Sequence, residues 1–200
     1  MGANGRIISL CDYTGIWSAP YRENGYEVIQ VDLERGQDVR LQEFLGNNGS
    51  GVCGVIAQPP CTHLAGSGAG WWKKKGEGPL LEGLAIVDAC MRIILSVRPR
   101  WWVLENPVGR LSRFIGPPQY TFQPSEFALF ADDPGEEAYT KRTCLWGTFT
   151  LPTPLFTGKD AALPPVLGSK MQKYGPTKNR ARLRSKTPEG FARAFYQANR

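Results

Sequence analysis

Four short apolar runs, each followed by polar or small residues, constrain the fold of this chain more than any other feature. They are rich in β-branched and aromatic side chains and cover residues 6–11, 27–31, 52–57 and 101–104. Such runs are typical of buried strands. Helices are expected over about residues 18–24 and over residues 80–97. This alternation predicts an α/β fold, with a mostly parallel sheet and helices on both faces.

The residues that follow these runs carry polar or reactive groups. In open α/β sheets, ligands bind beside the carboxyl ends of the strands. The candidate residues that this rule brings to one edge of the sheet are Asp12 with Gly15, Asp32, Cys61 and Glu105. The grouping predicts a cofactor site next to a catalytic site.

The first two runs, with the helix between them, match the first half of a nucleotide-binding unit. Asp32 lies 20 residues after Asp12, where a carboxylate can accept hydrogen bonds from ribose hydroxyls. The G-x-G-x-x-G pattern is absent, and a loop with Gly15 as its single glycine is a weak cradle for a pyrophosphate. The pattern therefore favours a nucleoside cofactor without a pyrophosphate.

Pro59-Pro60-Cys61 follows the third run. The two prolines stiffen the loop that presents the thiol, and a glycine-rich tract over residues 66–70 precedes the sequence WWKKK at 71–75. We interpret Cys61 as a covalent nucleophile beneath a flexible aromatic and basic flap that closes on an anionic ligand. The alternative is a buried structural cysteine in a proline turn, since free cysteines commonly act as small hydrophobic residues.

Composition excludes several classes of protein. A chain of 200 residues with 42% hydrophobic and 21% charged residues fits one globular domain. No stretch is long and apolar enough for a transmembrane helix, and the N-terminus lacks a signal-peptide pattern, so we expect an intracellular protein. Five cysteines without a Cys-x-x-Cys pair argue against a disulfide framework and a zinc cluster. His63 is the single histidine, which excludes a site with several histidine ligands and disfavours a Ser-His-Asp mechanism.

Positive charge is concentrated near the C-terminus. Residues 151–200 contain ten Lys and Arg against two Asp and Glu, whereas the first 150 contain 14 against 16. A basic segment on a nearly neutral body favours a polyanionic partner, most simply a nucleic acid. A solvated basic tail is the alternative.

The rest of the sequence suggests three parts. Strands expected at residues 120–123 and 144–149 complete a catalytic and cofactor-binding α/β domain over residues 1–150. Residues 151–183 form a short irregular basic segment, rich in Pro, Gly and Lys. Residues 184–200 hold a last helix that packs back on the domain, with Thr187 as its N-cap and Pro188 in its first turn.

At these positions the chain resembles the DNA cytosine-5 methyltransferases, in a compact form similar to phage-encoded methylases. Pro59-Pro60-Cys61 is similar to the family's catalytic Pro-Pro-Cys, and Glu105-Asn106-Pro107 is similar to its Glu-Asn-Val. Asp12-Tyr13-Thr14-Gly15-Ile16 resembles its first cofactor motif, and Thr187-Pro188-Glu189 resembles its late Thr-Pro-x-Glu. The ordered motifs cover residues 7–149 and, more loosely, 184–196.

The resemblance implies a Rossmann-like fold that binds S-adenosyl-L-methionine and needs no metal. The residues that it assigns to the cofactor lie after the first three strands: Asp12, Tyr13, Thr14, Gly15, Ile16, Trp17, Asp32, Leu33, Asp38, Val39 and Pro59.

The resemblance also implies chemistry at carbon 5 of cytosine. Cys61 would add as a thiolate to carbon 6 of the ring, and Glu105 would protonate nitrogen 3. A positive charge, from Arg142 or from the cofactor's sulfonium, would favour the thiolate. Asn106 would fix the loop by hydrogen bonding. The sequence offers no candidate for the base that removes the carbon 5 proton.

DNA is the expected partner, in the cytoplasm of a bacterium or of a phage-infected host cell. The target base must leave the duplex to be reached. Trp71 and Trp72 could stack in the resulting gap, and hydrophobic packing is the alternative for both. The residues expected to contact nucleic acid are His63, Trp71, Trp72, Lys73, Lys74, Lys75, Lys141, Arg180, Arg182 and Arg184.

The chain departs from the family's pattern at several places. Trp17 and Ser18 replace glycines, Lys141-Arg142-Thr143 is at best a partial Gln-x-Arg-x-Arg, and a C-terminal Gly-Asn-Ser is absent. About 35 residues separate the late motifs, where the family has a larger target-recognition domain, so we expect short or relaxed sequence specificity. The alternatives are an RNA cytosine-5 methyltransferase and an inactive DNA-binding decoy of the same fold. The missing G-x-G-x-x-G disfavours a dehydrogenase.

Overall fold

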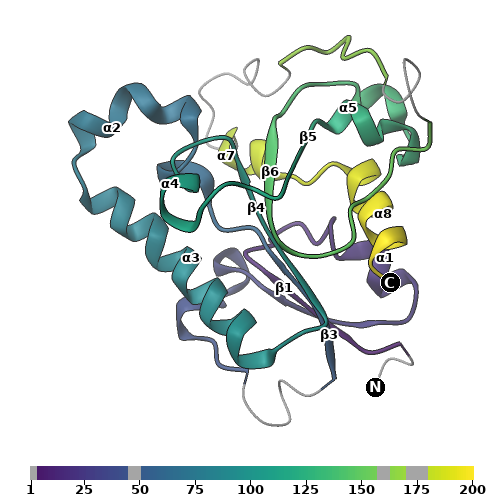
Figure 1. The fold of residues 1–200 in the computed structure, drawn as a ribbon, viewed down its shortest axis with the longest axis horizontal. Helices are drawn as coiled ribbons and strands as arrows, with labels where there is room; N and C mark the ends of the chain where they lie inside the picture. The colour runs from purple at the N-terminus through teal and green to yellow at the C-terminus, as the bar shows by residue number, and fades with distance from the viewer. Residues whose placement is uncertain (1–3, 45–50, 157–162, 170–179) are drawn as a thin grey trace.

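A six-stranded sheet forms the centre of the computed structural model, which describes residues 4–44, 51–156, 163–169 and 180–200. The strands follow the order β2-β1-β3-β4-β6-β5 across the sheet (Figure 1). Their bounds are β1 Arg6–Leu10, β2 Glu27–Val31, β3 Val52–Ala57, β4 Trp101–Pro107, β5 Tyr120–Phe122 and β6 Thr143–Thr148. The α/β prediction is confirmed, and a strand forms at each of the six expected places.

The sheet is parallel on one side only. β2, β1, β3 and β4 pair in parallel, whereas β6 lies between β4 and β5 and runs antiparallel to both. The sequence did not predict this reversal, because an apolar strand has the same residue pattern in either direction. Its consequence is that the start of β6 lies at the carboxyl edge of β4, where Thr143 pairs with Pro107.

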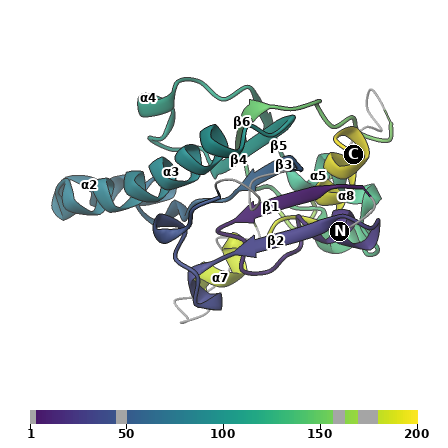
Figure 2. The ribbon, with the colours of Figure 1, turned by 90° about the horizontal axis from the view of Figure 1, so that it is seen from below.

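Helices cover both faces of the sheet (Figures 1 and 2). The long helix α3 (Gly78–Val97) packs on one face, and α1 (Ala19–Glu23) and α8 (Glu189–Ala198) pack on the other. Pro79 lies in the first turn of α3, as expected. Among the described residues, none of the helices has the length and apolarity that a membrane crossing needs.

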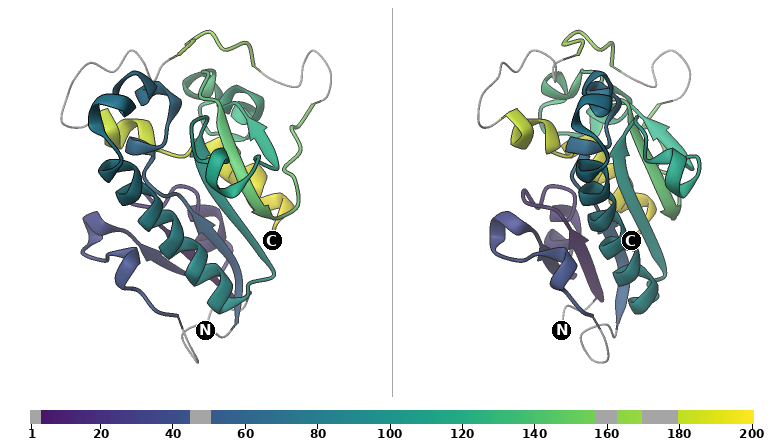
Figure 3. Two further views of the ribbon diagram at one scale, coloured as in Figure 1. Left: turned by 60° about the vertical axis from the view of Figure 1, so that its left-hand side comes forward. Right: turned by 90° about the vertical axis from the view of Figure 1, so that its left-hand side faces the viewer.

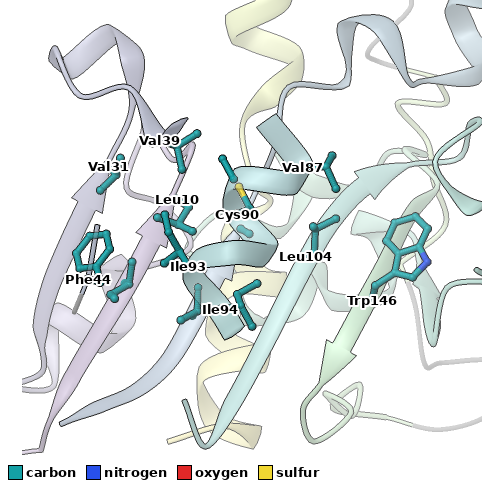
Figure 4. Packing of buried hydrophobic residues seen from close by; sticks show 14 of the residues in the cluster. Leu10, Val31, Val39, Phe44, Val87, Cys90, Ile93, Ile94, Leu104 and Trp146 are labelled. Atoms are coloured by element: carbon teal, nitrogen blue, oxygen red, sulfur yellow. The ribbon is translucent and has the colours of Figure 1, made fainter. Parts of the chain in front are cut away.

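The face under α3 is mainly aliphatic. Cys90 and Ile93 of α3 lie between Leu10 of β1 and Leu104 of β4 (Figure 4), and all four side chains are buried. They belong to a continuous cluster across β1, β3 and β4. Burial of this apolar surface stabilises the packing of α3 on those three strands.

The opposite face is aromatic. Phe191 of α8 stacks on Phe122 of β5 with ring centroids 3.8 Å apart. Trp17 meets Phe191 and Phe195 edge-on at 5.2 and 5.3 Å. All four rings are buried. These contacts tie the C-terminal helix to the sheet and to the loop after β1.

The glycine-rich flap differs from the expectation of a flexible segment. Residues Gly66–Gly68 form a 3-10 helix, η5, and Ala69–Lys75 form helix α2, which projects beyond the sheet next to the start of α3 (Figure 1). The tract is anchored by a bridge between Ala65 and Gly109. A Cβ on Gly109 would lie 2.0 Å from the carbonyl oxygen of Leu64, so this close approach requires glycine.

The start of the last helix also differs from the sequence expectation. Pro188, rather than Thr187, occupies the N-cap position of α8, and its side chain makes no capping hydrogen bond. The carboxylate of Glu137 instead accepts hydrogen bonds from the N–H groups of Glu189 and Gly190. The Thr187 side chain instead donates a hydrogen bond to Gln58, directly after β3.

Only parts of the expected irregular segment over residues 151–183 are described. Residues 157–162 and 170–179 lie outside the described residues. The last part of the segment is helical, since helix α7 covers Arg180–Ser185 and extends across the expected boundary between residues 183 and 184. In Figure 3, α7 lies beside the chain that leads into α2, consistent with a hydrogen bond of 3.2 Å from Arg184 Nη2 to Ser67 Oγ.

Candidate active site

Cys61 lies just beyond the carboxyl end of β3, at the start of the 3-10 helix η4 (Cys61–His63). The loop before it is fixed by Asn106 of β4, whose Nδ2 donates a hydrogen bond of 2.8 Å to the carbonyl oxygen of Pro59. Asn106 is fully buried. The expected role of Asn106 as a hydrogen bonder that fixes this loop is confirmed.

Glu105 lies beside Cys61 on the neighbouring strand. Ala57 pairs with Leu104 in the register of β3 and β4, so Glu105 is one residue beyond the end of β3. Burial raises the pKa of the Glu105 carboxyl, and the ammonium of Lys141 partly opposes this rise. Burial also raises the pKa of the Cys61 thiol, and the nearby Glu105 raises it further. The sheet therefore holds a half-buried thiol and a half-buried carboxyl within electrostatic reach of each other.

The cations near Cys61 are Lys141 and Arg184, which both lower the pKa of its thiol. Arg142, which the sequence suggested as the source of this charge, is not among the groups that shift the pKa of Cys61. Arg142 is exposed and lines a separate cavity, together with Gln123 and Glu126. Successive residues of an extended segment point to opposite sides, so only one of Lys141 and Arg142 can face the thiol.

A narrow crevice surrounds the Glu105 carboxyl. The residues that line it come from the loop after β1, β4, β5, the start of β6 and the start of α8: Trp17, Glu105, Phe122, Lys141, Thr143, Thr187, Pro188 and Phe191. The sequence had singled out most of these residues in separate motifs, but not Phe122 and Phe191, and it gave no sign that these distant segments meet at one place.

Gln58 and Thr187 form a link that sequence reasoning missed. Thr187 Oγ1 donates a hydrogen bond of 2.6 Å to Gln58 Oε1. Gln58 Nε2 is buried and has no hydrogen-bond partner among the described residues. The position of Gln58 directly before Pro59-Pro60-Cys61 was the only available signal. The link joins the late Thr-Pro motif to the loop that carries Cys61.

The loop after β1 is organised by the carboxylate of Asp12. This carboxylate accepts hydrogen bonds from Ser9 Oγ at 2.8 Å, Ser18 Oγ at 3.1 Å and the N–H of Gly15 at 2.7 Å. Gly15 has a φ of 68°, and an added Cβ would lie 3.1 Å from the side chain of Gln30. Asp12 therefore shapes the expected cofactor loop from within rather than from its surface.

The expected cofactor residues around Asp12 divide by exposure. Tyr13, Thr14 and Ile16 are half-buried, whereas Trp17 is fully buried in the aromatic face. Through its side chain, Trp17 is thus mainly a core residue that also reaches the crevice at Glu105.

Asp32 and Asp38 lie after β2, at the starts of the 3-10 helices η1 (Leu33–Arg35) and η2 (Val39–Leu41). Asp32 Oδ1 accepts a hydrogen bond of 2.8 Å from the N–H of Glu34, and burial raises the pKa of Asp32. Asp38 is paired with the Arg40 guanidinium, which lowers the pKa of Asp38. Val39 is buried in the aliphatic cluster, and Leu33 is 69% exposed.

The connections from β1 favour a ligand site between β1 and β3. The chain passes from β1 to β2 on one side and then to β3 on the other, which makes a topological switch point. Ligands of open α/β sheets bind outside the carboxyl ends of the strands at such a point. Asp12 follows β1, and Pro59, which is buried, follows β3, so the expected cofactor residues flank this position.

The two tryptophans of α2 have different environments. Trp71 is 60% exposed, with Lys74 Nζ 5.6 Å from its ring centroid. Trp72 is half-buried beneath the guanidinium of Arg110, at 4.6 Å from its ring centroid. Packing therefore accounts for Trp72 but not for Trp71. Lys73, Lys74 and Lys75 are exposed in the last turn of α2.

The remaining residues expected to contact nucleic acid occupy several positions. The His63 side chain is turned toward α3, with Nε2 3.8 Å from Glu82 Oε2. Arg184 lies near Cys61, as described above, whereas the side chains of Arg180 and Arg182 in α7 lie outside the described part of the structure. Among the described residues, no group of three or more His, Cys, Asp or Glu is arranged to hold a metal ion.

Comparison with known proteins gives limited additional information. No protein-family model matches the chain. The chain is 28% identical over 133 residues to a probable DNA (cytosine-5)-methyltransferase of frog virus 3 (isolate Goorha). The match covers 62% of this chain and 55% of the viral protein, so the chain spans about half the length of that relative.

Proposed function

We propose that this chain has a Rossmann-like methyltransferase fold and transfers a methyl group from S-adenosylmethionine to carbon 5 of cytosine in DNA. The reaction proceeds through a covalent adduct between Cys61 and the base. The observation that carries the proposal is a half-buried thiol after β3 beside a half-buried carboxyl in β4. Addition to a pyrimidine ring needs a nucleophile and a proton donor in that relation. The likeness to a viral protein named a probable DNA (cytosine-5)-methyltransferase supports methyltransferase activity in general terms.

The raised pKa of Glu105 suits a proton donor, whereas the pKa of Cys61 is raised too, so its thiolate depends on the cations beside it. Because burial raises the pKa of Glu105, its carboxyl retains a proton at a higher pH than an exposed glutamate and can donate it to nitrogen 3. Cys61 acts as the thiolate that bonds to carbon 6. Carbon 5 then becomes the nucleophile that accepts the methyl group. Loss of the carbon 5 proton and cleavage of the carbon–sulfur bond then release the methylated base and the Cys61 thiol.

The residues after β1 and β2 fit an adenosine cofactor. One oxygen of the Asp32 carboxylate accepts from the Glu34 N–H, which leaves the other oxygen for a ribose hydroxyl. Leu33, at 69% exposure, presents an apolar surface suited to an adenine ring. Asp38 would have to share its carboxylate with Arg40. When bound, S-adenosylmethionine supplies the electrophilic methyl group.

Double-stranded DNA suits the basic and aromatic rim of the site. The target base would be extruded toward Cys61, and exposed Trp71 could stack against bases while Lys73, Lys74 and Lys75 meet phosphates. The short segment after residue 150 leaves little chain for reading bases, so we infer short or relaxed sequence specificity.

One assay tests the proposal. Wild type, Cys61→Ala and Cys53→Ala are each incubated with methyl-labelled S-adenosylmethionine and with DNA or RNA at equal concentration, and the digested nucleosides are identified by mass spectrometry. Cys53, at the start of β3, is the matched control thiol. We expect labelled 5-methylcytosine from DNA with wild type and Cys53→Ala and none with Cys61→Ala, while calorimetry finds the cofactor bound by all three.

Other outcomes would replace the proposal. Turnover of more than a few per cent in Cys61→Ala would exclude it as the nucleophile. Label in RNA alone would change the substrate to RNA. DNA binding without label and without cofactor binding would indicate an inactive DNA-binding protein.

A further inference from the structure

Lys141 is held in a defined position between the start of β6 and the loop before α8. Its N–H donates a hydrogen bond of 2.8 Å to Gln123 Oε1, and its carbonyl oxygen accepts one of 2.9 Å from Thr143 Oγ1. Its Nζ lies 3.4 Å from the carbonyl oxygen of Lys186. The backbone of Lys141 is thus fixed on both sides, and Lys141 lines the crevice that Glu105 also lines.

The ammonium of Lys141 acts on both reactive groups of the site. It lowers the pKa of Cys61 and that of Glu105. Its own partner among the described residues is a carbonyl rather than a carboxylate, so its positive charge is not cancelled locally. Among the described residues, two further charged groups act on Cys61: Arg184 of α7, which is tethered to Ser67, lowers its pKa, and Glu105 raises it.

We propose that Lys141 is a positioning residue that stabilises the single negative charge of the catalytic pocket, first on the Cys61 sulfur and then on the Glu105 carboxylate. This inference rests on the proposed function for its second half. When the sulfur–carbon 6 bond forms, the sulfur gives up its negative charge to the ring. The proton of Glu105 passes to nitrogen 3 in the same step, which leaves the negative charge on the carboxylate.

A fixed cation beside both positions lowers the energy of each charged state without moving during the reaction. Arg142, next to it in sequence, is exposed and lines a different cavity, with Gln123 and Glu126. Lys141 and Arg142 therefore allow a matched test, in which the loss of one cation is compared with the loss of its neighbour in sequence.

The direct test measures alkylation of Cys61 by iodoacetamide as a function of pH, with the modified peptide quantified by mass spectrometry. The proteins are wild type, Lys141→Gln, Lys141→Arg and Arg142→Gln. We expect Lys141→Gln to react about tenfold more slowly at neutral pH, the change that one pKa unit produces. Lys141→Arg keeps the charge and most of the rate, and Arg142→Gln leaves the profile unchanged.

Glu105→Gln should change the alkylation rate of Cys61 in the opposite direction in the same experiment. It removes the neighbour that raises the pKa of Cys61, so alkylation should become faster. Superimposable profiles for Lys141→Gln and wild type would overturn the proposal, as would equal slowing in Lys141→Gln and Arg142→Gln. Urea unfolding of each variant establishes that the fold is retained.

A second measurement covers the reaction itself. The pH profile of kcat for methyl transfer should move to higher pH in Lys141→Gln and return toward wild type in Lys141→Arg. An unchanged kcat profile in Lys141→Gln would also overturn the proposal. If wild type makes no 5-methylcytosine, the proposed function fails while the alkylation profiles still report whether Lys141 governs the ionisation of Cys61.

Discussion

The two halves of the sheet's carboxyl edge hold their charged groups in opposite ways. After β1 and β2, the carboxylates of Asp12, Asp32 and Asp38 all accept hydrogen bonds from the protein's own backbone. After β3 and within β4, burial disfavours the charged forms of Cys61 and Glu105, and only Cys61 of the two has a backbone hydrogen bond that lowers its pKa.

This difference separates binding from chemistry. A carboxylate that its own loop already satisfies keeps a fixed position, which suits recognition of a ligand. A thiol and a carboxyl whose charged forms are disfavoured by burial cost stability when they ionise, and their reactivity remains available for a substrate. The following predictions test this contrast, from the largest expected effect to the smallest.

Glu105→Gln should lower the rate of methyl transfer by about 100-fold, the typical loss of a general acid, while stabilising the fold at alkaline pH. Burial raises the folded-state pKa of Glu105 above its ordinary value of 4.5. The stability linked to its protonated form is therefore complete below pH 4.5 and is lost as pH rises through the folded-state pKa. Glutamine does not ionise, so the variant avoids this loss.

Urea unfolding of wild type and Glu105→Gln across the pH range measures this effect. The difference in free energy of unfolding should move in favour of the variant as pH rises. If this difference does not change with pH, ionisation of Glu105 does not destabilise the folded protein. If the transfer rate of the variant is unchanged, another group protonates nitrogen 3.

Asp12→Ala should destabilise the protein by about 2–3 kcal/mol, because buried donors lose a charged acceptor. It should also weaken S-adenosylmethionine binding, since the Gly15 loop loses its internal support. Thermal unfolding and calorimetry give the two values. Asp88→Ala, an exposed position on α3, is the control, and an equal effect of both changes would refute the internal role of Asp12.

The two tryptophans of α2 give the smallest effect. Trp71→Ala should weaken DNA binding with little change in the unfolding midpoint, because its ring is largely exposed. Trp72→Ala should lower the midpoint, because its ring packs under Arg110, at a cost of about 1–2 kcal/mol. Fluorescence anisotropy with labelled duplex DNA and urea unfolding separate the two, and a reversed assignment would show that Trp71 is structural.

The resemblance to methyltransferases rested on Pro59-Pro60-Cys61 and Glu105-Asn106-Pro107, which the sequence placed after strands. The structure has those strands in neighbouring positions. It also assigns Asn106 to the loop of Pro59, as its sequence position suggested. By contrast, the glycine-rich flap is a helix, and α8 is capped by Glu137, 52 residues before Glu189. Local propensity cannot report a cap that arrives from another part of the chain.

The sequence by itself determined which residues carry reactive groups and that they share one edge of the sheet. Apolar periodicity defines the strands, and the carboxyl ends of parallel strands meet on one side. Only the tertiary structure decided which cation joins them. Because β6 runs antiparallel, its start reaches this edge, and because neighbouring side chains of an extended segment diverge, Lys141 acts on Cys61 and Glu105 while Arg142 faces the other cavity.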